Sequence, residues 1–146
     1  MEISGTASAL LRDKSPIVST VNSSATVFEA IQLMSNKNIG ALPVMDGDKL
    51  VGIVSERDYT RKVILKGKSS KNTRVEEIMT PEPIVVGPED TVAECLRIMT
   101  VKRIRHLPVL EHGEMIGILS IGDLVKWIIS AQEATIDQLT KYVFGE

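Results

Sequence analysis

The chain has 146 residues and a formal net charge of −2, with 25% charged and 43% hydrophobic residues. These values are typical of one compact domain, or of two small halves that share a core. They give no general reason to expect nucleic acid binding, and no apolar run approaches the roughly 18 residues that span a bilayer. Cys95 is the single cysteine, which excludes an internal disulfide. With no secretory leader in view, we expect a cytoplasmic protein, although a cleaved organelle leader stays open.

The first half of the chain predicts a strand, a helix, a hairpin and a second helix. A Thr-x-x-Glu capping box begins the first helix, whose apolar residues recur at i, i+3, i+4 and i+7. Two apolar runs around an Asp-Gly-Asp turn are typical of a hairpin. The strands are predicted at residues 19–21, 41–45 and 50–54, and the helices begin near Thr26 and Ser55.

A polar segment that contains glycine and serine follows at residues 67–73. Residues 75–79 predict a short helix, which ends at Thr80-Pro81 because the residue before a proline disfavours helical geometry.

The second half repeats the first at an offset of 65 residues. Between residues 21 and 58, 14 of 38 positions are identical to the residue 65 places later, where composition alone would give roughly two or three. The repeated strands are predicted at residues 84–86, 107–110 and 115–119, with helices beginning near Thr91 and Ser120. Apolar residues at rough helical spacing continue through residues 130–144.

Each half therefore has the order β-α-β-β-α. Because a three-stranded sheet covered by helices on one face leaves apolar surface exposed, we expect the two sheets to pack against each other. The predicted fold class is α+β, an α/β two-layer arrangement with pseudo-twofold symmetry and a C-terminal helix. The predicted domains are repeat 1 (1–66), a linker with a short connecting helix (67–80), repeat 2 (81–130) and a helical tail (131–146).

Each repeat closes with Gly-apolar-apolar-Ser-x-x-Asp, at residues 52–58 and 117–123, and Leu-Pro-Val precedes it at 42–44 and 107–109. These motifs, in register over residues 15–130, resemble a tandem pair of cystathionine β-synthase (CBS) domains, as in stand-alone CBS proteins without a catalytic domain. The resemblance implies a dimer of pairs and adenosyl ligands in the clefts between paired repeats. It also implies that the motif Asp holds the ribose hydroxyls, that the motif Ser lies near phosphate, and that apolar strand residues sandwich the adenine.

The same Ser-x-x-Asp spacing has a purely structural interpretation, because Ser at the N-cap and Asp at N3 form a capping box. Both interpretations stay open, since a helix N-terminus also attracts anions. The predicted ligand-binding residues are Thr20, Val21, Ala41, Ser55, Arg57, Asp58, Arg61, Lys71, Ile84, Val85, Val86, Ile104, Arg105, His106, Leu107, Pro108, Ser120 and Asp123.

Positive charge gathers in two segments. Residues 57–74 carry seven basic residues against one acidic residue, and residues 102–106 are Lys-Arg-Ile-Arg-His where the first repeat has Lys-Asn-Ile-Gly-Ala. The two clefts should therefore differ, with Arg105 and His106 favouring phosphate in one, and Gly40 and Ala41 leaving space in the other.

Two histidines and one cysteine cannot assemble a metal cluster at ligand-like spacing, and no nucleophile–base arrangement or Walker loop is visible. We therefore expect a regulatory module rather than an enzyme, one that binds AMP, ADP or ATP, forms a homodimer and acts on a separate protein. An NAD(H) sensor and a structural dimerisation module with vestigial clefts stay open. Nucleic acid binding through residues 57–74 is a third, weaker alternative.

Overall fold

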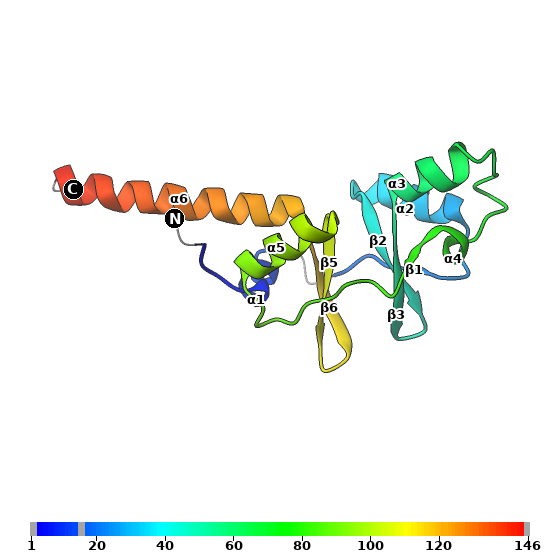
Figure 1. Cartoon of the computed structure of the whole chain (residues 1–146), viewed down its shortest axis with the longest axis horizontal. Helices are drawn as coiled ribbons and strands as arrows, with labels where there is room; N and C mark the ends of the chain where they lie inside the picture. Colours follow the sequence, from blue (N-terminus) through cyan, green and yellow to red (C-terminus); the bar gives the residue numbers. More distant parts are fainter. Residues whose placement is uncertain (1–2, 15–16, 145–146) are drawn as a thin grey trace.

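The computed structural model describes residues 3–14 and 17–144, and it forms two α+β units that lie side by side (Figure 1). The elements of the first unit are β1 (Val21–Asn22), α2 (Val27–Lys37), β2 (Ala41–Asp46), β3 (Lys49–Ser55), α3 (Glu56–Tyr59), the π-helical η1 (Thr60–Ile64), α4 (Val75–Ile78) and β4 (Thr80–Pro81). The second unit contains α5 (Val92–Lys102), β5 (His106–Glu111), β6 (Glu114–Ser120) and α6 (Ile121–Phe144), together with the N-terminal α1 (Ala7–Arg12).

The two hairpins have the same register. In the first, Leu42 pairs with Val54, and in the second Leu107 pairs with Leu119, with an irregularity after Val44 and Val109 respectively. The predicted fold class, with two repeats related by pseudo-twofold symmetry and a C-terminal helix, is confirmed.

The sheets differ from the predicted pair of three-stranded sheets. The first has four strands in the order β1-β2-β3-β4, and the second has the two strands β5 and β6. The strand predicted at residues 84–86 is wrong, because only Val86 makes a bridge, to Val109. Gly87 and Pro88 follow at once, and a strand rarely continues through that pair. The strand predicted at 19–21 is displaced to β1 (Val21–Asn22).

The helices that follow the two hairpins also differ. α3 has four residues and passes directly into η1, whereas α6 runs for 24 residues without a break. The predicted tail from residue 131 is therefore the second half of α6, as far as residue 144, and it projects away from the rest of the molecule (Figure 1). Over residues 3–14 and 17–144, no helix combines the length and apolarity needed to cross a membrane.

The short helix α4 is confirmed, and α1 is a counterpart that the sequence analysis did not predict. The Val75 N–H donates to the Ala25 carbonyl at 2.9 Å, and the Ala7 N–H donates to the Asp90 carbonyl at 2.8 Å. Ala25 and Asp90 are 65 residues apart, which is the offset of the repeat. The segment that precedes each repeat in the chain therefore packs on the other repeat.

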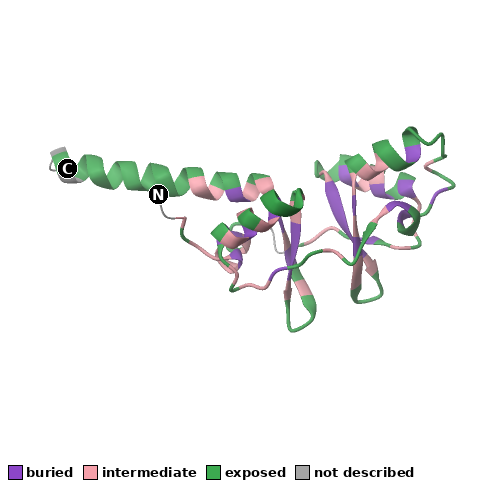
Figure 2. Ribbon diagram, viewed as in Figure 1, coloured by how far each residue is buried: buried purple, intermediate pink, exposed green. Residues whose placement is uncertain are grey.

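Each repeat buries its own apolar cluster between hairpin and helices (Figure 2). Ile78 of α4 joins the first cluster, and Ala7 and Leu10 of α1 join the second. Residues 67–73 contact the first repeat, since the carbonyls of the buried Thr73 and the half-buried Ser70 accept hydrogen bonds from the first amides of α2. Two pockets, described below, lie between the repeats and are lined by residues of both.

Candidate functional site

A pocket of about 650 Å³ lies between the two repeats and takes side chains from both. This volume is within the roughly 300–1,000 Å³ of small-molecule sites. The first repeat and the linker contribute Gly40, Ile53, Ser55, Glu56, Arg57, Asp58, Thr80, Glu82, Pro83 and Ile84, and the second contributes Arg103, Ile104, Arg105 and His106. We call this the central pocket.

The first Ser-x-x-Asp motif lies on the wall of the central pocket, where β3 passes into α3. The Asp58 N–H donates to Ser55 Oγ at 3.2 Å, and the Ser55 N–H donates to Asp58 Oδ2 at 2.9 Å, so the capping box is complete. Lys62 Nζ lies 3.2 Å from Asp58 Oδ1, and it also donates to the Ile78 carbonyl at 2.8 Å. The structural interpretation of the motif is therefore confirmed, and the carboxylate still borders the pocket.

Three guanidinium groups belong to residues that line the central pocket, namely Arg57 in α3, and Arg103 and Arg105 between α5 and β5. None of them makes an ion pair or donates a hydrogen bond to another residue that the structure describes. Glu56 and Glu82 supply carboxylates at the same pocket. Guanidinium groups are well suited to phosphate, because their planar donors match its oxygens.

His106 lines the central pocket from the start of β5, where it pairs with Ser120 of β6. Burial lowers the pKa of its imidazole, and the nearby charges of Lys14 and Arg105 lower it further, against the opposing effect of Asp123. The ring is therefore neutral at neutral pH and offers one donor and one acceptor.

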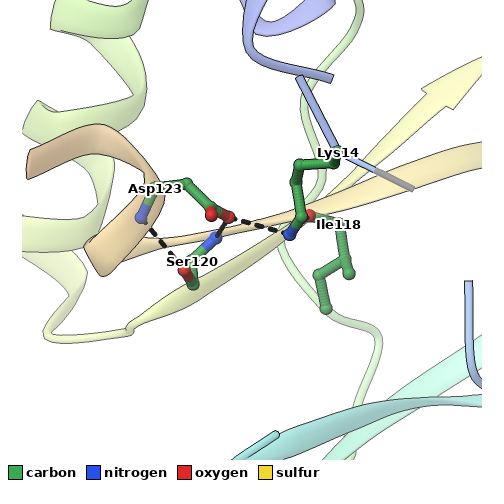
Figure 3. Close-up of polar contacts among 4 residues, drawn as sticks. All are labelled: Lys14, Ile118, Ser120 and Asp123. Atoms are coloured by element: carbon green, nitrogen blue, oxygen red, sulfur yellow. Dashed lines mark hydrogen bonds and ion pairs between the residues drawn. The ribbon is translucent and has the colours of Figure 1, made fainter. Parts of the chain in front are cut away.

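The second Ser-x-x-Asp motif has the same capping geometry but a different surrounding (Figure 3). The Ser120 N–H donates to Asp123 Oδ2 at 2.7 Å, and the Asp123 N–H donates to Ser120 Oγ at 3.1 Å. Lys14 Nζ lies 2.8 Å from Asp123 Oδ2 and donates to the Ile118 carbonyl at 2.8 Å. Burial raises the pKa of the Asp123 carboxyl, but the hydrogen bonds from Lys14 and Ser120 outweigh it, and the net pKa is lowered.

The structure brings together part of the predicted ligand-binding set. Seven of the eighteen residues line the central pocket, namely Ser55, Arg57, Asp58, Ile84, Ile104, Arg105 and His106. Gly40, expected to border the other cleft, lines this pocket too. Val85 lines a second pocket of about 610 Å³ between the tips of the two hairpins, which neither motif borders.

The other ten predicted residues line neither of these two pockets. Val21, Ala41, Val86 and Leu107 are buried, Thr20 and Arg61 are exposed, Pro108 lies in β5, and the Lys71 ammonium lies 5.0 Å from the centre of the Phe28 ring. Ser120 and Asp123 form the motif that Lys14 contacts.

The sequence analysis did not single out Arg103, Glu56, Glu82 or Lys14. Arg103 was visible within the basic segment 102–106, and the structure places it at the end of α5 with a left-handed φ of 55°. No sequence pattern indicated a role for Lys14, because its contact with Asp123 spans 109 residues of sequence.

The central pocket combines a carboxylate that can accept hydrogen bonds from hydroxyl groups, three cations for an anion, and the apolar side chains of Ile53, Ile84 and Ile104. Among residues 3–14 and 17–144, no group of three His, Cys, Asp or Glu side chains has the arrangement of a metal site.

The family model described as CBS domain matches residues 11–64 and 75–130. A putative signal-transduction protein with CBS domains from Burkholderia ambifaria is 50% identical, with a TM-score of 0.85 over 88% of this chain and 96% of that one. CBSX2, solved in complex with AMP, is 27% identical, with a TM-score of 0.71 over 86% of this chain and 97% of that one. A hexameric CBS-CP12 protein from bloom-forming cyanobacteria is 33% identical, with a TM-score of 0.75 over 86% of this chain and 72% of that one.

Among curated proteins, the CBS domain-containing protein CBSX3, mitochondrial, of Arabidopsis thaliana is 42% identical over 125 residues, which is 82% of this chain. The chain spans 61% of the length of CBSX3, and 22% of the length of the Arabidopsis protein CBSCBSPB2. Each matched segment contains one copy of the Ser-x-x-Asp motif and one copy of the hairpin that recur at the 65-residue offset. The chain belongs to the CBS domain family, as a tandem pair of CBS domains.

Proposed function

We propose that this chain is a regulatory module that binds an adenine nucleotide, AMP, ADP or ATP, in the central pocket and acts on a separate protein without catalysis of its own. The observation that carries the proposal is the composition of that pocket. It joins the Asp58 carboxylate of one repeat to the unpaired guanidinium groups of Arg103 and Arg105 from the other. A nucleotide carries hydroxyl donors and a phosphate at opposite sides of one sugar, which matches that pair of features.

In the proposed complex, Asp58 accepts hydrogen bonds from the ribose hydroxyls, and the arginines neutralise the phosphate. Ile84 and Ile104 offer the adenine ring apolar contacts. The complex of CBSX2 with AMP supports an adenosyl ligand in this family. NAD(H) contains the same adenosine half, so it is the alternative ligand.

A ligand in the central pocket would contact both repeats and would favour the arrangement of the repeats that it fits best. Its influence on a partner is limited to its difference in affinity between the two arrangements, typically about 1–3 kcal/mol. The proposed target is a separate protein, because the described chain consists of the two CBS repeats, α1 and α6.

We propose that the second half of α6 pairs with a second copy of the chain. Ile129, Ile136 and Val143 recur every seven residues, with Leu139 three residues after Ile136, and all four are about half exposed or more. Heptad spacing of this kind lets two identical helices pack along one seam. The hexameric CBS-CP12 protein supports assembly of several chains in this family.

The basic segment 57–74 favours a structural role over a nucleic acid surface. Lys62 contacts Asp58 and the Ile78 carbonyl, Arg74 donates to the Ser24 carbonyl, and Lys71 lies over the Phe28 ring. These side chains are already engaged within the chain. For the compartment, the cytoplasm is our prediction, and the mitochondrial CBSX3 supports an organelle as the alternative.

The test is thermal unfolding and calorimetric titration with AMP, ADP, ATP and NAD(H). A ligand at about 100 times its dissociation constant adds about 2.7 kcal/mol to the free energy of unfolding. Asp58→Asn and Arg105→Ala should each weaken binding at least tenfold, whereas the control Arg97→Ala should not, because Arg97 pairs with Glu94 on α5 away from the pocket. No shift with any of the four compounds at millimolar concentration would refute the proposal and leave the structural dimerisation module.

A further inference from the structure

Both motif aspartates contact a lysine ammonium, but the two lysines come from different parts of the chain. Lys62 lies four residues after Asp58, within the same helical segment. The residue 65 places after Lys62 is Trp127, whose indole N–H donates to the Ser4 carbonyl at 2.8 Å. The second repeat therefore has no lysine at the position of Lys62, and Lys14, from the end of the N-terminal segment, supplies the cation instead (Figure 3).

Lys14 occupies a place that a strand fills in the first repeat. Ile53 of β3 pairs with Thr80 of β4. Ile118 of β6 is the residue 65 places after Ile53, and its carbonyl accepts a hydrogen bond from Lys14 Nζ at 2.8 Å. The ammonium is thus held by two acceptors, this carbonyl and Asp123 Oδ2, both at 2.8 Å. Two directed bonds from one group favour a fixed position over a loose surface pair.

The contact with Lys14 fills the hydrogen-bonding capacity of one carboxylate oxygen, Asp123 Oδ2. Asp123 Oδ2 accepts from the Ser120 N–H and from Lys14, and a carboxylate oxygen has two lone pairs to offer. At Asp58, Oδ2 accepts from the Ser55 N–H and from the Ser55 hydroxyl, which can rotate away. Lys62 lies 3.2 Å from the other oxygen, Asp58 Oδ1, and leaves one of its two lone pairs free. A vicinal diol that binds both carboxylate oxygens therefore displaces only the Ser55 hydroxyl from Asp58 Oδ2, whereas at Asp123 it displaces the Lys14 ammonium from Oδ2.

The surroundings of the two carboxylates also favour ligand binding at Asp58 over Asp123. Asp58 borders the central pocket with its arginines, whereas Asp123 borders neither that pocket nor the one between the hairpin tips. The bond displaced at Asp58 joins a neutral hydroxyl to a carboxylate, whereas the bond displaced at Asp123 joins two opposite charges that are only partly exposed. The exchange at Asp123 therefore costs more.

We propose that Lys14 closes the second adenosyl site, so that the chain binds one nucleotide, at Asp58, and Asp123 becomes available only when Lys14 is displaced. This inference rests on the proposed function and adds a determinant of stoichiometry that lies outside both Ser-x-x-Asp motifs. The class of ligand is a nucleotide with a free 2′,3′-diol. The N-terminal segment thereby acts as a built-in competitor for one of two sites of shared ancestry.

The experiment counts bound AMP, and ATP in a parallel series, by equilibrium dialysis and calorimetry on the full chain. The wild type should bind one nucleotide per chain. Lys14→Met keeps the length of the side chain, removes its charge and should bind two, with second-site affinity raised roughly tenfold or more. Lys14→Met with Asp123→Asn should return to one. Lys66→Met, an exposed lysine outside both pockets, is the matched control, and Lys14→Gln is the second variant should the methionine variant unfold.

The outcomes separate the two proposals. Two nucleotides bound by the wild type, or one still bound by both Lys14 variants, overturns the role of Lys14 and leaves the proposed function intact. No nucleotide on the wild type but one on Lys14→Met, lost again with Asp123→Asn, supports Lys14 and rejects the central pocket. No nucleotide on any variant rejects both. A loss of bound nucleotide on replacing Lys14 would make it a phosphate ligand instead, which also overturns the inference.

Discussion

The two Ser-x-x-Asp motifs have nearly the same internal geometry, and they differ in what the rest of the chain brings to them. In both, the Asp carboxylate accepts from the Ser N–H within 2.9 Å and the Ser hydroxyl caps the following helix. At Asp58 the other repeat contributes arginines, and at Asp123 the N-terminal segment contributes Lys14. The local capping structure is thus the same in both repeats, whereas the charged groups that surround the two motifs differ and come partly from residues distant in sequence.

The short helices α4 and α1 extend the comparison, because each packs on the repeat that does not follow it in the chain. They are unequal in one respect. The segment after α4 adds the strand β4 to β3, whereas β6 has no strand in that place among the described residues, and Lys14 contacts its edge. If this comparison is right, substitutions at equivalent positions should have similar effects on stability where the two repeats are alike, and different effects where they differ.

The largest expected effect concerns the buried residues of the two short helices. Leu10→Ala and Ile78→Ala should each lower the free energy of unfolding by about 2–4 kcal/mol, because each removes buried methyl groups and leaves a cavity. The two side chains are 4% and 1% exposed. Arg12→Ala, on the exposed side of α1, is the control and should change stability by less than about 0.5 kcal/mol.

Hydrogen exchange distinguishes the two variants. Leu10→Ala should first reduce protection in α5, which shares its cluster, and Ile78→Ala should first reduce protection in α2. A cost for Leu10→Ala no greater than that for Arg12→Ala would show that α1 is not part of the second core.

Two equivalent glycines test the difference between the β4 strand and the N-terminal segment. A Cβ at Gly52 would lie 2.8 Å from the Thr80 carbonyl oxygen, besides Met79 Sδ at 2.5 Å. The three atoms nearest to a Cβ at Gly117 all belong to the Leu11 side chain, the closest at 2.5 Å. Because backbone yields less than a side chain, Gly52→Ala should cost about 2–3 kcal/mol and Gly117→Ala about 1 kcal/mol. Urea unfolding measures both, and equal costs would argue that the two supports are equally rigid.

The third comparison is between Cys95 and Ala30, which are equivalent and both fully buried. Cys95→Ala should cost about 0.5–1.5 kcal/mol, as for the loss of one buried methyl group. Burial, reinforced by the carboxylates of Asp90 and Glu94, raises the pKa of the Cys95 thiol to about 11. The native protein should therefore react with thiol reagents only as fast as it opens. Rapid labelling of the folded chain at pH 7 would contradict this placement.

Much of the fold could be predicted from the sequence because the same pattern of residues occurs in both repeats. The 65-residue offset predicted both hairpins and the N-caps at Thr26 and Thr91, since these depend on neighbouring residues. The predicted capping boxes are only half formed in the described part of the chain, because each hydroxyl accepts from the Glu N–H but neither carboxylate returns to the N-cap amide, and Glu94 pairs with Arg97 instead. The errors arose where the copies diverge. Nothing local to Val86 indicated that its strand would shrink to a bridge, and the weakly patterned helix α1 is stabilised by burial of Ala7 and Leu10 against a repeat that begins far along the chain.

The candidate site was predictable to the extent that a pattern accompanied its residues. Ser55, Asp58 and the basic segment with Arg105 stood out by repetition or by charge. Glu82 lines both pockets and lies at a left-handed φ of 47°, but a glutamate after a proline carries no such signal. Lys14 is one of many lysines, and only the three-dimensional structure shows that its ammonium reaches Asp123.

The smallest expected effect concerns the Lys14–Asp123 ion pair and pH. Both side chains are partly exposed, at 35% and 26%, so Lys14→Met should lower stability at pH 7 by less than about 1 kcal/mol. The net pKa of Asp123 is lowered in the folded state, so the stability from the pair is present above the unfolded pKa of about 3.9 and is lost as pH falls through the folded pKa. The stabilisation that the pair gives to wild type should therefore be absent near pH 2.5. His106 titrates separately: its folded pKa is also lowered, so its contribution is lost as pH falls from about 6.5. Removing Lys14 removes one cause of that lowering, so the variant should lose less stability than wild type between pH 7 and pH 5. Urea unfolding at pH 7, 5 and 2.5 separates the two effects. A wild type that stayed more stable than the variant at pH 2.5 would show that Lys14 stabilises the fold through packing or the Ile118 carbonyl rather than through Asp123.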